Sequence, residues 1–302
     1  MQKHYPGQVV SGTLEFTLQK TMSYKNIEIN FTGREMVCRV EPTGQNSSAS
    51  SLIYKNYIDE RVIAWNSEDT ADGKMGPGSY NFPFQVTLPL DCPSSFLTKK
   101  SSFGGDSTGT VHYGVAALMT REKKRKTLWT RGYAEIRVAK LVDINKPELL
   151  IPVCETKQKR VECLCCNSGE IEFTVSLPRK GFYAGRHFPL TIQTENNSSR
   201  RAFMMVEIKK VVLLRGDGLM TDKVKTTAMF KNSPYIRARS SYTWSPDSLI
   251  VPSAVESVFD STYIKLSYML YVTSVIRCTK NSTIKIPIVV GNETPESEQL
   301  LH

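Results

Sequence analysis

A group of cysteines is the densest set of reactive side chains in this sequence. Cys163, Cys165 and Cys166 are near neighbours and Cys154 precedes them, so the four could supply thiolates to a zinc ion. Zinc sites usually bring paired Cys-x2-4-Cys knuckles or nearby histidines, and this cluster has neither. Buried or palmitoylated thiols are the alternatives. We expect no metal and no other cofactor, and the odd, unevenly spaced set of seven cysteines argues against a disulfide framework.

Catalytic motifs are not visible in the sequence. It contains no GxSxG, HExxH or Walker A segment and no GxGxxG after a strand. The adjacent carboxylates at residues 59–60 and 68–69 are explained by solvent exposure. His112 and His187 fall within strand patterns, where a histidine is more often packed or exposed than a ligand. We therefore predict that the protein is not an enzyme.

A basic segment at residues 121–131 is the strongest local charge feature of a chain whose net charge is +10. Such a run favours an anionic partner, either lipid headgroups or nucleic acid, and a solvated hairpin tip is the alternative. Single-strand binders interleave basic residues with stacking aromatics, whereas Trp129 stands nearly alone here, so we expect no nucleic acid. The candidate contacts to a membrane or anion are Arg121, Lys123, Lys124, Arg125, Lys126 and Arg131.

The elements that must position these residues are β-strands. Phe82, Phe84, Val86 and Leu88 alternate with polar residues, which is the period of a half-buried strand. Pro83 then faces outward, and because proline cannot donate to a sheet ladder, its strand must lie at an edge or leave that position unpaired. The same alternation recurs along the chain, and no window of helical length has a convincing 3.6-residue stripe. We predict an all-β protein.

Composition and order bound the architecture. Apolar content of 40% and charged content of 23% are typical of a soluble globular protein, and no apolar run approaches the length of a membrane span. Two half-chains repeat a similar order of strands, and the second contains Ile286-Pro287-Ile288 in the pattern of Phe82-Pro83-Phe84. We predict two tandem immunoglobulin-like β-sandwiches, at residues 1–144 and 153–291, a linker at 145–152 and a flexible tail at 292–302.

Several motifs, in their order and spacing, resemble the arrestin domain-containing proteins, or α-arrestins. The first half is similar through Tyr5-Pro6-Gly7, Gly78-x-Tyr80-x-Phe82-Pro83-Phe84, Pro93-Ser94-Ser95-Phe96 and Val111-x-Tyr113-x-Val115. The second is similar through Pro147-Glu148-Leu149-Leu150, Arg179-Lys180-Gly181-Phe182-Tyr183, Glu195-Asn196-Asn197-Ser198 and Ile286-Pro287-Ile288. The resemblance implies arrestin N and C domains over nearly the whole chain. It also implies a first strand before the Tyr-x-Gly turn, which we expect to be missing here.

What the resemblance implies for function is a non-enzymatic trafficking adaptor. Such proteins bind cytosolic segments of membrane-protein cargo and act in the cytoplasm, peripherally at plasma membrane and endosomes. In the family, Pro-Pro-x-Tyr motifs in the tail recruit ubiquitin ligases to the cargo. This sequence has no such motif, so the ubiquitin branch stays open. One branch of the family binds thioredoxin through a cysteine shortly before a tryptophan, but Ser240 to Trp244 contain no cysteine, so we do not expect that partner.

The tail holds one candidate sorting signal. Glu296, Leu300 and Leu301 fit the acidic dileucine pattern that clathrin adaptors read as an extended peptide, although polar tails match it readily. A retromer-like coat subunit with the same fold is the alternative to an adaptor, and stable stoichiometric assembly would distinguish it. A nucleic-acid-binding β protein ranks below both.

Overall fold

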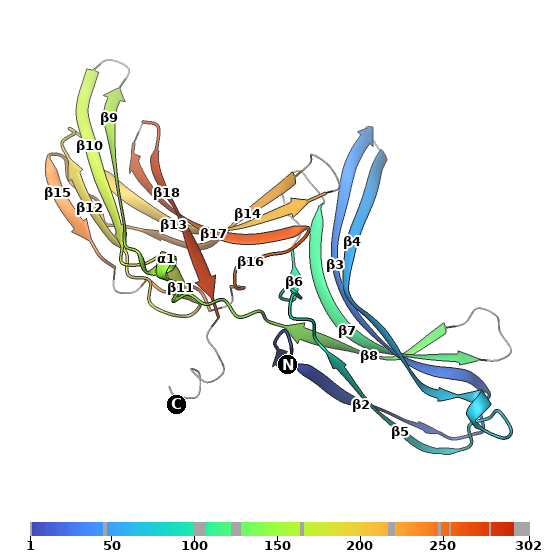
Figure 1. The fold of residues 1–302 in the computed structure, drawn as a ribbon. Helices are drawn as coiled ribbons and strands as arrows, with labels where there is room; N and C mark the ends of the chain where they lie inside the picture. The colour runs from blue at the N-terminus through green and yellow to red at the C-terminus, as the bar shows by residue number, and fades with distance from the viewer. Residues whose placement is uncertain are drawn as a thin grey trace. The chain divides into compact units, whose positions relative to one another are not determined.

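A computed structural model describes residues 2–44, 47–98, 107–121, 128–163, 166–216, 221–246, 249–253, 255–277 and 279–292. It divides the chain into two compact units. Unit 1 contains residues 1–140, 214–221 and 261–264, and unit 2 contains residues 141–213, 222–260 and 265–302. Both are built almost entirely of strands (Figure 1), as the alternation predicts. Within the described ranges, no helix is long and apolar enough to cross a membrane.

The larger sheet of unit 1 has the strand order β1-β8-β7-β3-β4, with β6 beside β7. Its longest part is the antiparallel hairpin of β3 and β4, and β1 joins the opposite edge in parallel with β8. A 3-10 turn, η1 (Ser67–Asp69), follows β4 and is capped by the side chain of Asn66. The strands are β1 (Lys3–His4), β3 (Tyr24–Gly44), β4 (Ser47–Asn66), β6 (Phe96–Leu97), β7 (Thr108–Arg121) and β8 (Leu128–Val138).

A two-stranded sheet of β2 (Val9–Leu18) and β5 (Gly78–Thr87) forms the second layer of unit 1. Phe84 on β5 meets Phe31 on β3 edge to face, with ring centroids 5.6 Å apart. Pro83 is exposed, while Val86 and Leu88 are buried. The predicted outward proline in an edge strand is therefore confirmed.

Unit 1 is closed on one side of its core by a tyrosine that lies over a glycine. A Cβ atom on Gly33 would lie only 2.6 Å from Cδ1 of Tyr113, so the ring occupies the space that any side chain would need. The Tyr113 hydroxyl donates to the carbonyl of Pro93 at 2.8 Å. This bond ties the segment that leads into β6 to the central strand β7. Burial raises the pKa of Tyr113 far above its ordinary value, which keeps the hydroxyl a donor.

Unit 2 is a second sandwich with a smaller sheet, β15-β12-β10-β9, and a larger one, β11-β18-β17-β13-β14, to which β16 is added beside β17 (Figure 1). A single helical turn, α1 (Pro147–Leu150), lies within the predicted linker. The strands are β9 (Val153–Cys163), β10 (Cys166–Leu177), β11 (Gly181–Tyr183), β12 (Thr191–Asn196), β13 (Ala202–Arg215), β14 (Thr221–Asn232), β15 (Ser240–Trp244), β16 (Phe259–Asp260), β17 (Ile264–Ile276) and β18 (Ser282–Gly291).

The core of unit 2 follows from strict alternation. Phe173 on β10, Tyr268 on β17 and Ile286 on β18 are each at most 1% exposed, like most of their inward neighbours. Pro287 lies outward on β18, opposite Met269 of β17. The alternation in the second half of the sequence therefore predicted the buried face correctly.

The turn between β12 and β13 is organised by a buried asparagine. The amide nitrogen of Asn196 donates to the carbonyls of Arg200 and Arg237, at 2.7 and 2.9 Å. Its oxygen accepts from the backbone N–H and the hydroxyl of Ser198. Asn196 and Ser198 are both fully buried. The side chain thus replaces the backbone hydrogen bonds that a tight turn leaves unmade.

Candidate functional site

The most unusual polar group of unit 1 is Glu35, which lies on the inward face of β3. The alternation that buries Phe31 and Val37 also buries Glu35, whose exposed fraction is 0%. A buried carboxylate costs free energy unless hydrogen-bond donors surround it. The site is therefore defined by the groups that supply those donors.

Three neutral donors surround the Glu35 carboxylate. The Tyr57 hydroxyl on β4 donates to Oε2 at 2.8 Å. On the other oxygen, Oε1, the backbone N–H of Tyr263 donates at 2.9 Å and the Ser261 hydroxyl lies at 2.6 Å. Two of these donors come from residues 261–264, a turn that is remote in sequence and that clusters with unit 1. We call Glu35, Tyr57 and this turn the Glu35 clasp.

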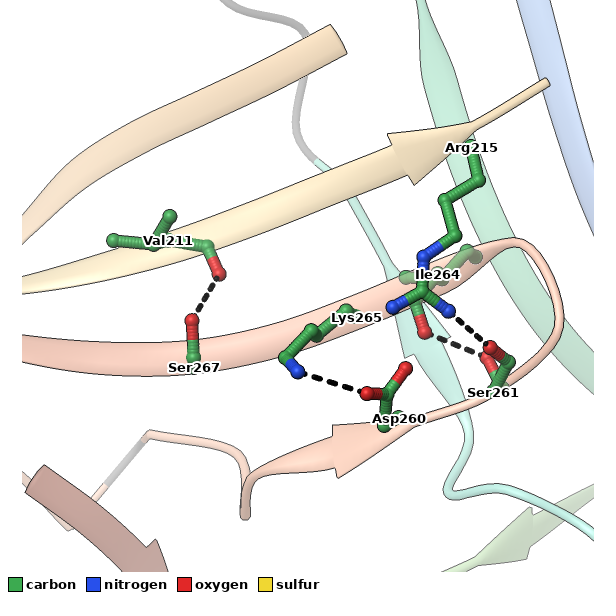
Figure 2. Close-up of polar contacts among 7 residues, drawn as sticks. All are labelled: Val211, Arg215, Asp260, Ser261, Ile264, Lys265 and Ser267. Carbon is green, nitrogen blue, oxygen red and sulfur yellow. Dashed lines mark hydrogen bonds and ion pairs between the residues drawn. The ribbon is translucent and has the colours of Figure 1, made fainter. Parts of the chain in front are cut away.

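The turn has its own internal order (Figure 2). The backbone N–H of Ser261 donates to the carbonyl of Ile264 at 2.9 Å, and the Ser261 hydroxyl lies 2.7 Å from the same carbonyl. Arg215 donates from Nη1 to the Ser261 carbonyl at 2.9 Å and from its backbone N–H to Tyr263 at 2.7 Å. The turn therefore presents its donors in a fixed geometry, which makes them effective partners for a buried anion.

Lys55 and Tyr57 complete the clasp from β4. The ammonium group of Lys55 lies 4.8 Å from the centre of the Tyr57 ring and donates to the Thr262 hydroxyl at 3.1 Å. Burial, and then the hydrogen bond and the negative charge of Glu35, raise the pKa of Tyr57 to about 12. Tyr57 consequently remains a donor at every physiological pH.

The chemistry of the clasp is binding rather than catalysis. The Ser261 hydroxyl does lie beside the Glu35 carboxylate, but that carboxylate is fully buried and engaged by donors, so it has no open side for a substrate. In the part of the chain that the structure describes, no group of three or more histidine, cysteine or acidic side chains could hold a metal ion. The arrangement can hold the 261–264 turn on the β3–β4 hairpin.

The basic segment begins at the end of β7 and reaches into β8. Arg121 ends β7, is exposed, and pairs in register with Tyr24 of β3. Arg131 lies on β8, but the structure does not describe its side chain. Lys123, Lys124, Arg125 and Lys126 lie outside the described residues. The predicted membrane contact at these positions stays a prediction.

The cysteines are spread over different elements. Cys163 ends β9 opposite Cys166 at the start of β10, and Cys165 between them lies outside the described residues. Cys154 is a free, exposed thiol near the start of β9, and Cys92 is a free, buried thiol of unit 1. Burial raises the pKa of Cys92, which makes it an inert packing residue.

Beside Cys154, unit 2 has an apolar groove of about 560 Å³. Val153 and Leu177 line it together with several prolines, and the bonded hydroxyls of Thr191 and Ser245, 2.8 Å apart, lie at its wall. The predicted dileucine signal at Glu296, Leu300 and Leu301 lies outside the described residues, so it stays a prediction.

Sequence reasoning missed the Glu35 clasp, although a signal was present. The alternation of β3 places Phe31, Gly33, Glu35 and Val37 on one face, and a charged residue inside an apolar face predicts a buried, paired carboxylate. Its partners were not predictable, because residues 261–264 lie more than 200 positions away, as the sequence separation of 226 between Glu35 and Ser261 shows.

Comparison with known proteins gives matches over nearly the whole chain. The arrestin (or S-antigen) N-terminal domain matches residues 2–145, and the corresponding C-terminal domain matches residues 167–295. Arrestin domain-containing protein 4 of Homo sapiens is 26% identical over 294 residues, which cover 94% of this chain and 67% of that protein. The Mus musculus protein of the same name is 30% identical over 297 residues, which cover 94% of this chain and 68% of that protein.

A further relative carries a different name. The Thioredoxin-interacting protein of Sus scrofa is 25% identical over 295 residues, which cover 95% of this chain and 71% of that protein. The curated relatives therefore extend beyond the region that this chain matches.

Proposed function

Because this chain belongs to the arrestin domain-containing protein family, we propose that it is a non-enzymatic adaptor that binds cytosolic segments of membrane-protein cargo and links them to endocytic sorting machinery. The observation that carries the proposal is the pair of arrestin domain matches, which together span both units. The proposed place of action is the cytoplasmic side of the plasma membrane and of endosomes.

Open strand edges support a binding role. Within the described residues, the β2–β5 sheet has no further strand on either side, and β4, β9, β14 and β15 each end a sheet. Extended peptides add to such edges through main-chain hydrogen bonds. The outward Pro83 blocks a donor on β5, so an added peptide is expected on another edge.

Clathrin adaptors and ubiquitin ligases are the proposed downstream partners. Glu296, Leu300 and Leu301 would serve as the clathrin-adaptor signal. The sequence contains no Pro-Pro-x-Tyr motif, so a ligase would be reached through another surface or through another adaptor.

Purification of the tagged chain from gently solubilised cells tests the adaptor role, with bound proteins identified by mass spectrometry. Integral membrane proteins with clathrin adaptors or ligases are the expected partners, and Leu300→Ala/Leu301→Ala should lose the clathrin adaptors while keeping the cargo. The matched control is Leu149→Ala/Leu150→Ala, a second Leu-Leu pair in the chain. A preparation with neither cargo nor sorting proteins, or one dominated by RNA, would contradict the proposal.

An anionic lipid surface is the proposed contact of the basic segment between β7 and β8. Basic residues near such a surface contribute about 1 kcal/mol each, so Lys123→Glu/Lys124→Glu/Lys126→Glu should weaken binding to phosphatidylserine vesicles roughly a hundredfold or more. Exposed Lys157, Lys280 and Lys285 of unit 2 give a control with the same charge change. Equal binding by both triple variants would remove the lipid role and leave the adaptor role intact.

A further inference from the structure

The free edge of β4 is the most unusual open surface of unit 1. Within the described residues, β4 pairs only with β3, so its other edge offers a long row of main-chain groups. Along it, Leu52, Tyr54 and Ile63 are 59%, 54% and 60% exposed. Long edge strands that expose apolar side chains are sites of pairing with another strand.

A β-bulge divides the two faces of β4. Ile58 pairs with Gly33 and Asn56 pairs with Arg34, so Tyr57 is the extra residue of the bulge. Register with β3 then assigns the side chains on both sides of the bulge. Those on the inward face are Ile53, Lys55, Tyr57, Ile58, Glu60 and Val62, and those on the outward face are Leu52, Tyr54, Asn56, Asp59, Arg61 and Ile63.

The residues of β4 are complementary to themselves when the strand is reversed. If a two-fold axis passes between Tyr57 and Ile58, every residue of one copy meets a residue from the same face of the other. Lys55 then faces Glu60, which gives two opposite-charge pairs, and the apolar residues meet at both ends. The other pairs are Leu52 with Ile63, Ile53 with Val62, Tyr54 with Arg61, Asn56 with Asp59, and Tyr57 with Ile58.

Neighbouring registers lose this match. A shift of the axis onto Ile58 sets Lys55 opposite Arg61, which pairs like charges, and a shift onto Tyr57 sets Lys55 opposite Asp59. Both shifts join an inward with an outward residue. Directly opposite like charges destabilise a strand pair, and opposite charges stabilise it. Because the bulge lies at the axis, inward residues of one copy meet inward residues of the other on both sides of it.

We propose that this chain forms a two-fold homodimer by antiparallel pairing of the β4 edges of two copies, with Lys55 of each copy opposite Glu60 of the other. Such an interface is isologous and closes on itself, as two-fold interfaces do. The partner is a second copy because the pattern of charge and apolar residues is palindromic within one strand. The dimer joins the two larger sheets of unit 1 into one continuous sheet.

Charge reversal tests the register. Lys55→Glu and Glu60→Lys each create two like-charge pairs, so each should raise the dimer dissociation constant about tenfold or more, measured by analytical ultracentrifugation of the full chain over a range of concentrations. Lys55→Glu/Glu60→Lys restores both pairs with exchanged signs, so its dissociation constant should be about tenfold or more below that of Lys55→Glu alone, in which the contact of Lys55 with Thr262 is equally lost. Lys140→Glu and Glu148→Lys, exposed residues outside the strands, are the matched controls.

Disulfide capture gives a second readout that does not depend on charge. Tyr54 and Arg61 lie about 23 Å apart along one strand, at roughly 3.3 Å per residue, so they cannot bond within one copy. In the proposed pair they face each other, and Tyr54→Cys/Arg61→Cys should give a covalent dimer under mild oxidation. Tyr54→Cys alone should not. A monomer at all concentrations, no cross-link, or a dimer that is indifferent to both charge reversals would overturn the proposal.

Discussion

The inward face of β3 in unit 1 contains a charged residue, whereas the compared stretch of β13 in unit 2 is apolar. On β13, Met204, Val206 and Ile208 are buried in unbroken apolar alternation. On β3, the alternation that buries Phe31 is interrupted by Glu35, which is buried just as completely. This stretch of β13 therefore packs through apolar side chains, whereas the inward face of β3 needs donors at a fixed place.

This difference teaches that the two cores respond differently to local change. Apolar packing is non-directional, so a conservative substitution on β13 lets its neighbours adjust. A buried carboxylate depends on the geometry of each donor, and the loss of a donor leaves charge without compensation. We expect unit 1 to be sensitive to single polar atoms and unit 2 to side-chain volume.

The largest expected effect comes from a cavity in unit 2. Phe173→Ala should destabilise unit 2 by about 3–5 kcal/mol, because a fully buried ring is removed from a packed core. Differential scanning calorimetry should show a lower transition for unit 2, and Phe173→Leu, which keeps more volume, should lie between the variant and wild type. A shift of less than about 1 kcal/mol would show that this core is loosely packed.

Removal of the Glu35 carboxylate should have the next largest effect. Glu35→Ala leaves the donors of Tyr57, Ser261 and Tyr263 without their acceptor, which should cost unit 1 about 2–3 kcal/mol. Hydrogen exchange at residues 261–264 should accelerate at the same time. Glu15→Ala, an exposed carboxylate on β2, is the control. Unchanged exchange in the turn would show that Glu35 does not hold it.

Loss of one donor should have a smaller effect on the same region. Ser261→Ala removes the hydroxyl but keeps the backbone donor of Tyr263, so about 1 kcal/mol of stability should be lost, with a modest rise in exchange at the turn. Chemical denaturation followed by exchange mass spectrometry measures both. The exposed Ser79 on β5 provides a serine-to-alanine control. A loss of stability as large as that of Glu35→Ala would show that this one hydroxyl supplies most of the stabilisation from the clasp.

The smallest effect concerns alkaline pH. The pKa of Tyr57 is about 12 in the folded chain, above its ordinary value of 10.0. Between these values the unfolded chain releases the proton and the folded chain keeps it, so stability that is present below pH 10 is lost as the pH rises toward 12. Tyr57→Phe should show a shallower decline in the melting temperature over this range. Identical slopes of melting temperature against pH for the variant and wild type would mean that Tyr57 does not cause the alkaline loss of stability.

The sequence predicted the strands and their buried faces because alternation is a local property. Phe82 to Leu88 and Ile286 to Ile288 show period 2 directly, and the outward positions of Pro83 and Pro287 follow from it. The pairing order was beyond reach, since which strand meets which depends on contacts between remote segments. The β3–β4 hairpin is an example, because its bulge at Tyr57 leaves no clear mark in the sequence.

The Glu35 clasp shows the same limit in the candidate site. A charged residue on an inward face predicts that hydrogen-bond donors surround it, but it does not identify the residues that supply them. Two of the donors belong to residues 261–264, which alternation assigned only to the start of a strand. The basic segment can be read directly from the sequence, as can the two strands that flank it, and its contact with a membrane or anion stays a prediction.

The buried turn at Asn196 has a consequence for the biogenesis of the protein. Asn196-Asn197-Ser198 reads as an acceptor sequence for N-linked glycosylation. The nitrogen that would carry the sugar already donates to two carbonyls in a fully buried position. A glycan at Asn196 and a folded unit 2 therefore exclude each other, and a copy of the chain glycosylated there before folding would fail to build the β12–β13 turn.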